Sequence, residues 1–219
     1  MIYHMEKVVV ITGGSEGLGK AIAEALASKY RVIILARDEG KLKETAIELG
    51  CKFFACDITD QGQIEKTVNN ILGEFGKIDC LVNNAGIFFG GRLEANRPAA
   101  IREMFDTNVV GTILLTREVV SHMKKNKSGI VININSQAVL SAKPERSIYN
   151  ASKWAITGFT KCMQQELRGT GVKMAGIYPG KMNTGIFQKA GVEMDLRDAL
   201  DPQEVARVVQ FVFERDDRV

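Results

Sequence analysis

Two side chains one helical turn apart could exchange protons in this chain. Tyr149 and Lys153 stand at positions i and i+4 of SIYNASKWAITGF, residues 147–159, so a helix would place both on one face. Their unperturbed pKa values are about 10 and 10.4. An ammonium group ~4 Å from the phenol would favour the phenolate by at most roughly 4 kcal/mol. We therefore predict that Lys153 lowers the pKa of Tyr149 toward neutrality, where proton transfer is most efficient.

The histidines and cysteines of the chain give no sign of hydrolytic or metal chemistry. The chain has two histidines, His4 and His122, which argues against a Ser-His-Asp hydrolase and against histidine-based metal sites. Its four cysteines show neither a C-x-x-C nor a zinc spacing, so we expect no metal, and free thiols in a reducing compartment, the cytoplasm. An alternative interpretation of the Tyr149–Lys153 pair, a packed phenol beside a solvated amine, stays open on these residues alone.

A glycine-rich loop follows the first apolar run of the chain. Gly13, Gly17 and Gly19 form G-x-x-x-G-x-G between an apolar run at 7–12 and an amphipathic segment at 17–29. Glycines there allow a tight turn and a close approach of the backbone to a pyrophosphate, and the following helix offers free N–H groups to the phosphates. Because a strand precedes the loop and a helix follows it, the pattern predicts a dinucleotide site.

The end of the second apolar run bears on the choice of dinucleotide. Dinucleotide folds commonly place an acid here to bind the adenine ribose 2′-OH. This chain has Ala36 followed by Arg37, and an arginine suits a 2′-phosphate, which favours NADP(H). Asp38 could replace the acid in a shifted register, and Glu16 in the glycine loop would repel a phosphate. NAD(H) therefore remains an alternative.

Short apolar runs alternate with amphipathic segments along the whole chain. The expected strands are 7–12, 31–35, 52–56, 78–82, 129–135 and 172–178, and the expected helices are 17–29, 39–49, 60–75, 97–126 as two helices, 148–168 and 201–214. Continuous apolar strands separated by helices predict a parallel sheet covered on both faces. Right-handed crossovers then give a Rossmann-like, doubly wound, three-layer α/β/α sandwich.

Length, composition and charge indicate one domain that binds neither nucleic acid nor a membrane. The 219 residues contain no linker or shift in composition, so we expect a single domain over 1–219, with 1–5 as a flexible extension. The formal net charge is +3 and the basic residues are scattered, which argues against nucleic-acid binding. No apolar run approaches the ~18–20 residues that a membrane span needs.

Seven motifs together resemble the short-chain dehydrogenase/reductase family in its compact single-domain form. The resemblance runs from about residue 7 to 213. The motifs are TGGSEGLG (12–19), Asp57 in ACDITD, NNAG (83–86), Asn108 in FDTNVVGT, Ser136 in ININSQA, YNASK (149–153) and PGKMNT (179–184). One such motif would be weak evidence, but all of them occur in the order of the family.

The resemblance implies a catalytic set of four residues. Tyr149 would be the general acid/base that protonates the substrate oxygen, and Lys153 would lower the pKa of the phenol and hold the nicotinamide ribose. Ser136 would donate a hydrogen bond to the reacting oxygen, and Asn108 would hold a water that links Lys153 to solvent. The implied reaction is hydride transfer between NADP(H) and a carbonyl or secondary alcohol.

The resemblance also assigns residues to the cofactor, in addition to Arg37, Tyr149 and Lys153. Those expected around the pyrophosphate are Gly13, Ser15, Gly17, Leu18 and Gly19. Those expected beside the adenine and its ribose are Asp57, Ile58, Asn84, Ala85 and Gly86. Those expected on the nicotinamide side are Pro179, Gly180 and Thr184.

The C-terminus departs from the family pattern. Members normally continue with one more strand, but this chain stops at QFVFERDDRV, so we expect the final strand to be missing or shortened and a sheet edge to be open. The family implies a homodimer or homotetramer. The short C-terminus argues against that assembly, because the missing strand often contributes to a subunit interface in the family. It also motivates an alternative function, a non-catalytic dinucleotide-binding or regulatory protein of the same fold.

The substrate pocket is only partly encoded in the sequence. Its candidate residues are Phe88, Phe89, Gln137, Val139, Leu140 and the segment 185–199. Glycines at Gly185 and Gly191 suit a mobile lid. The mixture of apolar and polar residues indicates a carbonyl or secondary alcohol of moderate polarity.

Overall fold

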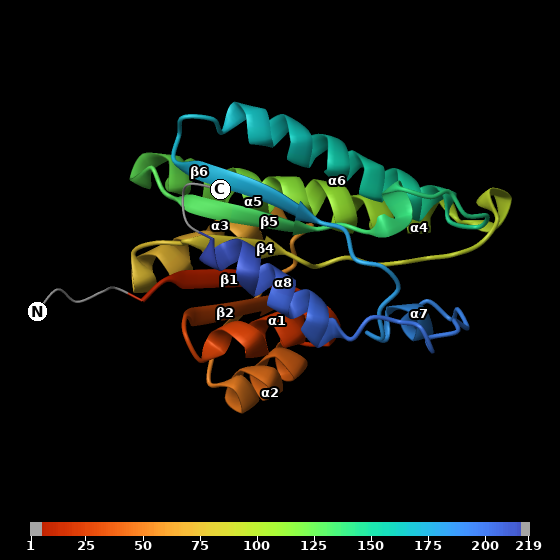
Figure 1. Ribbon diagram of the computed structural model, residues 1–219, viewed down its shortest axis with the longest axis horizontal. Helices are drawn as coiled ribbons and strands as arrows, with labels where there is room; N and C mark the ends of the chain where they lie inside the picture. Colours follow the sequence, from red (N-terminus) through yellow and green to blue (C-terminus); the bar gives the residue numbers. More distant parts are fainter. Residues whose placement is uncertain (1–5, 216–219) are drawn as a thin grey trace, which may run out of the picture.

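Six parallel strands form the centre of the molecule (Figure 1). The computed structural model describes residues 6–215, so the extension expected at 1–5 lies outside the described residues, as do 216–219. The strands are β1 (Val8–Thr12), β2 (Arg31–Ala36), β3 (Lys52–Ala55), β4 (Cys80–Asn83), β5 (Gly129–Ile134) and β6 (Val172–Ile177). Their order is β3-β2-β1-β4-β5-β6, and each predicted strand is confirmed.

Helices lie on both faces of this sheet, as the alternating pattern predicts. They are α1 (Gly17–Ala27), α2 (Glu39–Leu49), α3 (Gln61–Phe75), α4 (Pro98–Phe105), α5 (Thr112–Asn126), α6 (Ser147–Glu166), α7 (Ile186–Lys189) and α8 (Pro202–Glu214). Figure 1 shows α5 and α6 on one side of the strands and α1, α2 and α8 on the other. Within residues 6–215, every helix lacks the length or the hydropathy that a bilayer-spanning segment needs.

Two hydrophobic cores separate the sheet from its helical layers. Side chains alternate between the faces of a strand, so Val8 and Val10 of β1 join the core formed with α3 and α5. Val9 and Ile11 of the same strand join the core formed with α1, α2 and α8. All four side chains are buried, which is why the strand is apolar throughout. The three-layer sandwich is therefore confirmed.

A buried polar cluster ties α5 and α6 to the sheet. Asn83 of β4 donates from its side-chain nitrogen to Thr116 Oγ1 of α5 and to Asn133 Oδ1 of β5, at 2.8 Å each. Asn133 in turn donates to Thr160 Oγ1 of α6 at 2.8 Å. Buried amides cost free energy unless they are hydrogen-bonded, so this cluster favours one placement of the two helices.

A π-helical turn joins α4 to α5, where the sequence predicts two helices without specifying the junction. The turn covers Asp106–Gly111 and carries Asn108. Gly111 is buried against the loop after β3, because a Cβ added there would lie 2.6 Å from the carbonyl oxygen of Ile58. The close approach of two backbones therefore requires glycine at this position.

The sheet ends at β6 on one side. No seventh strand follows α8 within residues 6–215, so β6 is an edge strand of the described sheet. The helix α8 instead packs on α1, and its side chains Val205, Val209 and Phe213 are buried in the second core. The end of the described chain is thus held by a helix rather than by strand pairing.

The close approach at Gly111 gives a prediction about stability. Gly111→Ala should lower the free energy of unfolding by about 1–3 kcal/mol, because the new methyl group would displace the Ile58 backbone. Gly73→Ala in α3 is the matched control, since a Cβ there meets nothing within 4 Å. It should raise the free energy of unfolding by about 0.5–1 kcal/mol. Urea unfolding of both variants checks this, and an equal effect of the two substitutions would contradict it.

Candidate active site

A cleft of about 480 Å³ opens at the carboxyl ends of the strands. It lies beside β1 and β4, the point where the strand order reverses, and ligands of open α/β sheets bind at such points. Most of the residues expected at the cofactor line it together. They are Gly13, Ser15, Gly17, Leu18, Arg37, Asp57, Ile58, Asn84, Ala85, Gly86, Tyr149, Lys153 and Thr184. The volume is in the range of small-molecule sites.

Three residues expected at the cofactor, Gly19, Pro179 and Gly180, are not among those that line the cleft. Gly19 is buried under the glycine loop, and a Cβ there would lie 2.1 Å from the Gly13 carbonyl oxygen. The Pro179 carbonyl accepts a hydrogen bond from the Gln137 N–H at 2.9 Å, and Gly180 lies against the Gln137 amide. Gly19 therefore supports the glycine loop, whereas Pro179 and Gly180 contact Gln137, an exposed residue that does not line the cleft either.

The glycine loop has the backbone geometry of a phosphate-binding turn. Gly13 and Gly17 have φ values of +65° and +53°, which disfavour any residue with a Cβ. The residue before α1, Glu16, makes no side-chain capping hydrogen bond, so no side chain caps the N-terminus of the helix. An uncapped helix N-terminus at a cleft suits an anion, and the loop therefore fits the pyrophosphate of a dinucleotide.

Thr12 joins the glycine loop to the loop after β4, a role that sequence analysis missed. Its hydroxyl oxygen accepts hydrogen bonds from the N–H groups of Asn84 and Ala85, at 3.0 and 2.9 Å. The Asn84 side chain donates back to the carbonyls of Thr12 and Gly13, at 2.9 and 3.3 Å. A threonine at the end of an otherwise apolar strand was the available signal.

The charges near Arg37 are arranged differently from the expectation. Asp38 caps α2, accepting a hydrogen bond from the Lys41 N–H at 3.1 Å. Glu16 pairs with Lys189 and lies 3.7 Å from the Lys41 amine, and the hydrogen bond from Lys189 lowers the pKa of Glu16. The two carboxylates that counted against a 2′-phosphate are therefore both engaged, whereas Arg37 lines the cleft with an exposed side chain.

Ser136 and Tyr149 meet at the end of β5. The Ser136 hydroxyl lies near enough to the phenol to lower its pKa, and its oxygen accepts a hydrogen bond from the Ala138 N–H at 3.1 Å. The Tyr149 ring packs edge-on against Phe88, with ring centroids 5.0 Å apart. The hydroxyl and the phenol thus lie where one carbonyl oxygen could receive a hydrogen bond from each.

The predicted direction of the Tyr149 pKa is wrong. Burial raises the pKa of this phenol, and the Ser136 hydrogen bond and the positive charge of Arg146 lower it only in part. The Lys153 amine lies 5.8 Å from the Tyr149 ring centroid and donates to the Ile134 carbonyl at 3.2 Å. Desolvation is therefore the largest influence on the Tyr149 pKa, and it favours the protonated phenol.

Lys153 is itself in a dry environment. The residue is only 8% exposed, and burial lowers the pKa of its amine to about 8. Asn135, at the end of β5, donates to the Lys153 carbonyl at 3.2 Å and to Thr157 Oγ1 at 2.7 Å. Sequence analysis missed Asn135, although an amide at the end of a β-branched run was the signal. This residue positions the helical turn that carries Lys153.

Asn108 connects three parts of the site from the π-helical turn. Its Oδ1 accepts from the Ile87 N–H at 2.8 Å, and its Nδ2 donates to the Ile87 carbonyl at 3.0 Å and to Ser152 Oγ at 3.2 Å. Ser152 in turn donates to the Tyr149 carbonyl at 2.7 Å. The side chain therefore braces the loop after β4 against α6, and its expected role in holding a water stays a prediction.

Aromatic side chains close the substrate end of the cleft. Phe88 is 4% exposed and packs edge-on against Phe187 of α7, with ring centroids 5.3 Å apart. Phe89 also lines the cleft, and Val139 is buried nearby in the turn after Ser136. Leu140 was expected in the pocket, but its side chain is 80% exposed. The turn ends there and directs this residue to solvent.

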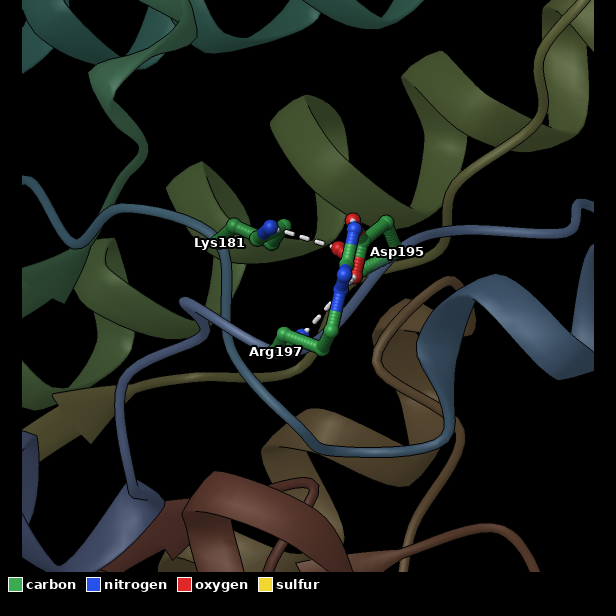
Figure 2. A network of polar contacts seen from close by, with 3 residues as sticks. All are labelled: Lys181, Asp195 and Arg197. Carbon is green, nitrogen blue, oxygen red and sulfur yellow. Dashed lines mark hydrogen bonds and ion pairs between the residues drawn. The ribbon is translucent and has the colours of Figure 1, made fainter.

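The segment between β6 and α8 is fastened at its base. Met182 pairs with Leu200 in an isolated parallel bridge. The Lys181 amine donates to the Asp195 carbonyl at 2.5 Å, and the Arg197 guanidinium pairs with the Asp195 carboxylate at 2.7 Å (Figure 2). Arg197 holds the pKa of Asp195 at about 2. These contacts hold together the two ends of the segment 181–200, which we call the excursion. Its expected mobility stays a prediction.

The structure offers no metal centre in the part that it describes. Within residues 6–215, no group of three His, Cys, Asp or Glu side chains is placed to hold a metal ion. The four cysteines, Cys51, Cys56, Cys80 and Cys162, are all free thiols.

Comparison with known proteins places the chain in a family. The model of the short chain dehydrogenases matches residues 7–195. A relative named carbonyl reductase family member 4, from Xenopus tropicalis, is 32% identical over 96% of this chain and 92% of its own length.

Solved structures of similar fold agree with this family assignment. The closed form of a serine dehydrogenase complexed with NADP+ has a TM-score of 0.92 at 27% identity, covering 97% of this chain and 91% of its own. A 3-ketoacyl-(acyl-carrier-protein) reductase from Brucella melitensis complexed with NADH has a TM-score of 0.89 at 28% identity, covering 95% and 90%. With its fold, its cleft and these relatives in agreement, the chain belongs to the short-chain dehydrogenase family of oxidoreductases.

Proposed function

We propose that this protein transfers a hydride between NADP(H) and a carbonyl or secondary alcohol, with Tyr149 as the general acid/base. The observation that carries the proposal is the meeting of Ser136 and Tyr149 beside a buried Lys153, with Tyr149 and Lys153 both lining the cleft. A hydroxyl, a phenol and an amine in this order can bind a carbonyl oxygen, protonate it and supply the replacement proton.

The cleft fits a nicotinamide dinucleotide. The positive-φ glycines and the uncapped α1 suit the pyrophosphate, and the exposed Arg37 suits a 2′-phosphate. The engagement of Asp38 and Glu16 with other groups supports NADP(H) over NAD(H). The serine dehydrogenase with NADP+ supports the same choice, while the reductase with NADH keeps NAD(H) as the alternative. When bound, the nicotinamide supplies the hydride.

In the direction of carbonyl reduction, the substrate carbon gains the hydride and its oxygen gains a proton. Tyr149 gives that proton, because its raised pKa keeps the phenol protonated, and Ser136 donates a hydrogen bond to the same oxygen. The phenolate left behind then needs a proton. Lys153, with a pKa of about 8, can supply it near neutral pH. Oxidation of an alcohol runs the same steps in reverse.

The proposal also covers the compartment and the oligomeric state of the protein. The four free thiols support a reducing compartment such as the cytoplasm. The edge strand β6 supports a homodimer or homotetramer in which a second copy covers that edge. The alternative function is a non-catalytic dinucleotide-binding protein, which would bind NADPH without turning over any aldehyde, ketone or alcohol.

Removal of one oxygen atom tests the role of Tyr149. Tyr149→Phe should lower kcat on a carbonyl panel by about 10²–10⁴-fold, because no other group at the site can give the proton as directly. The Kd for NADPH, measured by fluorescence, should change little. Tyr30→Phe is the control, since this phenol is bonded to Glu214 on the surface. Full turnover by Tyr149→Phe would overturn the mechanism.

Removal of a charge tests the choice of cofactor. Arg37→Ala should raise the Kd for NADPH by roughly 10–100-fold, the loss expected for a charge-assisted hydrogen bond, and should change the Kd for NADH little. Lys43→Ala removes an exposed cation from α2, the helix that follows Arg37, and should affect neither Kd. Equal effects on NADPH and NADH would show that Arg37 does not read a 2′-phosphate.

The lowered pKa of Lys153 predicts a dependence of stability on pH. Between pH 8 and 10.5 the unfolded chain keeps a proton that folded Lys153 has released, so stability rises with pH. Relative to Lys153→Met, the wild type should gain about 2 kcal/mol in the free energy of unfolding from pH 7 to 9.5. Burial raises the pKa of Cys51, Cys56 and Cys80, which opposes this trend but cancels in the comparison.

Urea unfolding at several pH values measures the effect. Lys161→Met, on the exposed face of the same helix, is the control and should follow the wild type. A constant difference between the wild type and Lys153→Met across this range would contradict the assigned pKa.

A further inference from the structure

An arginine without an acidic partner in residues 6–215 lies against Phe88, one of the residues that line the cleft. Arg146 immediately precedes α6, three residues before Tyr149. Its guanidinium carbon lies 5.6 Å from the Phe88 ring centroid and 6.0 Å from the Phe187 ring centroid. Its Nη2 donates to Met194 Sδ at 3.8 Å. Within residues 6–215 this guanidinium forms no ion pair, so its charge is not neutralised by the described protein.

The surroundings of this charge are apolar. Phe88 is almost fully buried, and Phe187 and Met194 are partly buried. Contacts with aromatic rings stabilise a guanidinium but leave most of its N–H donors without an acceptor, and a thioether sulfur is a weak acceptor. A carboxylate placed here would accept two of those N–H groups at once, which is the geometry that a guanidinium fork favours.

The position of Arg146 relative to the reacting centre limits the substrate. Its guanidinium and the Tyr149 ring both contact Phe88. The positive charge of Arg146 also acts on the Tyr149 phenol, lowering its pKa. When the carbonyl oxygen of a substrate reaches Tyr149, a second group of that substrate, only a few bonds from the carbonyl, would therefore reach Arg146.

We infer that the substrate is a short oxo acid or hydroxy acid, whose carboxylate is bound by Arg146 while its carbonyl or hydroxyl group reacts at Tyr149. This inference rests on the proposed function. A carboxylate suits the site better than a phosphate, because one guanidinium balances one charge. The nearest cation of α7, Lys189, is engaged with Glu16 and is not free to balance a second charge.

Matched acids and esters test this inference without any variant. The oxidation of NADPH is followed with pyruvate, acetoacetate and levulinate, and with the methyl ester of each. The three acids place the carboxylate at increasing distance from the carbonyl. In at least one pair the wild type should have a kcat/KM about tenfold or more higher for the acid, as expected for a charge-assisted pair with Arg146.

Variants then assign the preference to Arg146. Arg146→Met keeps an unbranched side chain against the two aromatic rings, and the ratio of acid to ester kcat/KM should fall by about tenfold or more. Arg146→Lys keeps the charge without the fork and should give an intermediate ratio. Lys143→Met removes an exposed cation from the same loop and should leave the ratio unchanged. The Kd for NADPH of each variant checks that it is folded.

The outcomes separate this inference from the proposed function. If the wild type reduces the esters as well as the acids in every pair, the inference is wrong and the proposed function stands. It is also wrong if the acid preference survives in Arg146→Met. If NADPH binds but no acid, ester or other carbonyl is reduced, the proposed function itself fails. A preference for one acid that depends on Arg146 supports both.

Discussion

Desolvation of the Lys153 amine is the constraint around which the site is organised. A lysine with so little exposed surface needs hydrogen-bond partners, and the Ile134 carbonyl at the end of β5 provides one. Asn135 and Thr157 then fix the helical turn that carries the lysine. The amine can lose its proton near neutral pH only because water is excluded, so the packing of α6 on the sheet and the acid–base chemistry depend on one another.

The remaining residues of the site are positioned by hydrogen bonds from side chains to backbone groups of loops that are distant in the sequence. Thr12 ties the end of β1 to the loop after β4, and Asn108 ties that loop to α6. Each uses a side chain that satisfies main-chain groups, which is how irregular segments stay ordered at the edge of a sheet. The π-helical turn allows this, because it places Asn108 where both ends of its amide find partners.

Much of the fold followed from the sequence, because apolar runs and amphipathic periods are local signals. The six strands, the covering helices and the grouping of the cofactor residues at one cleft are of this kind. The direction of the Tyr149 pKa was not predictable, since residue spacing gives the distance between charges but not their burial. The capping role of Asp38 and the aromatic contacts of Arg146 depend on tertiary structure, and in the sequence both residues resemble ordinary surface charges.

Glu16 is shared between the glycine loop, α2 and the excursion that carries α7. Its partners approach from elements that are far apart in the chain, and all three side chains are largely open to solvent. Exposed ion pairs weaken as dissolved ions screen them. Dissolved ions therefore weaken the attachment of the excursion to the glycine loop and α2, at a point where Glu16 and Lys189 both line the cleft.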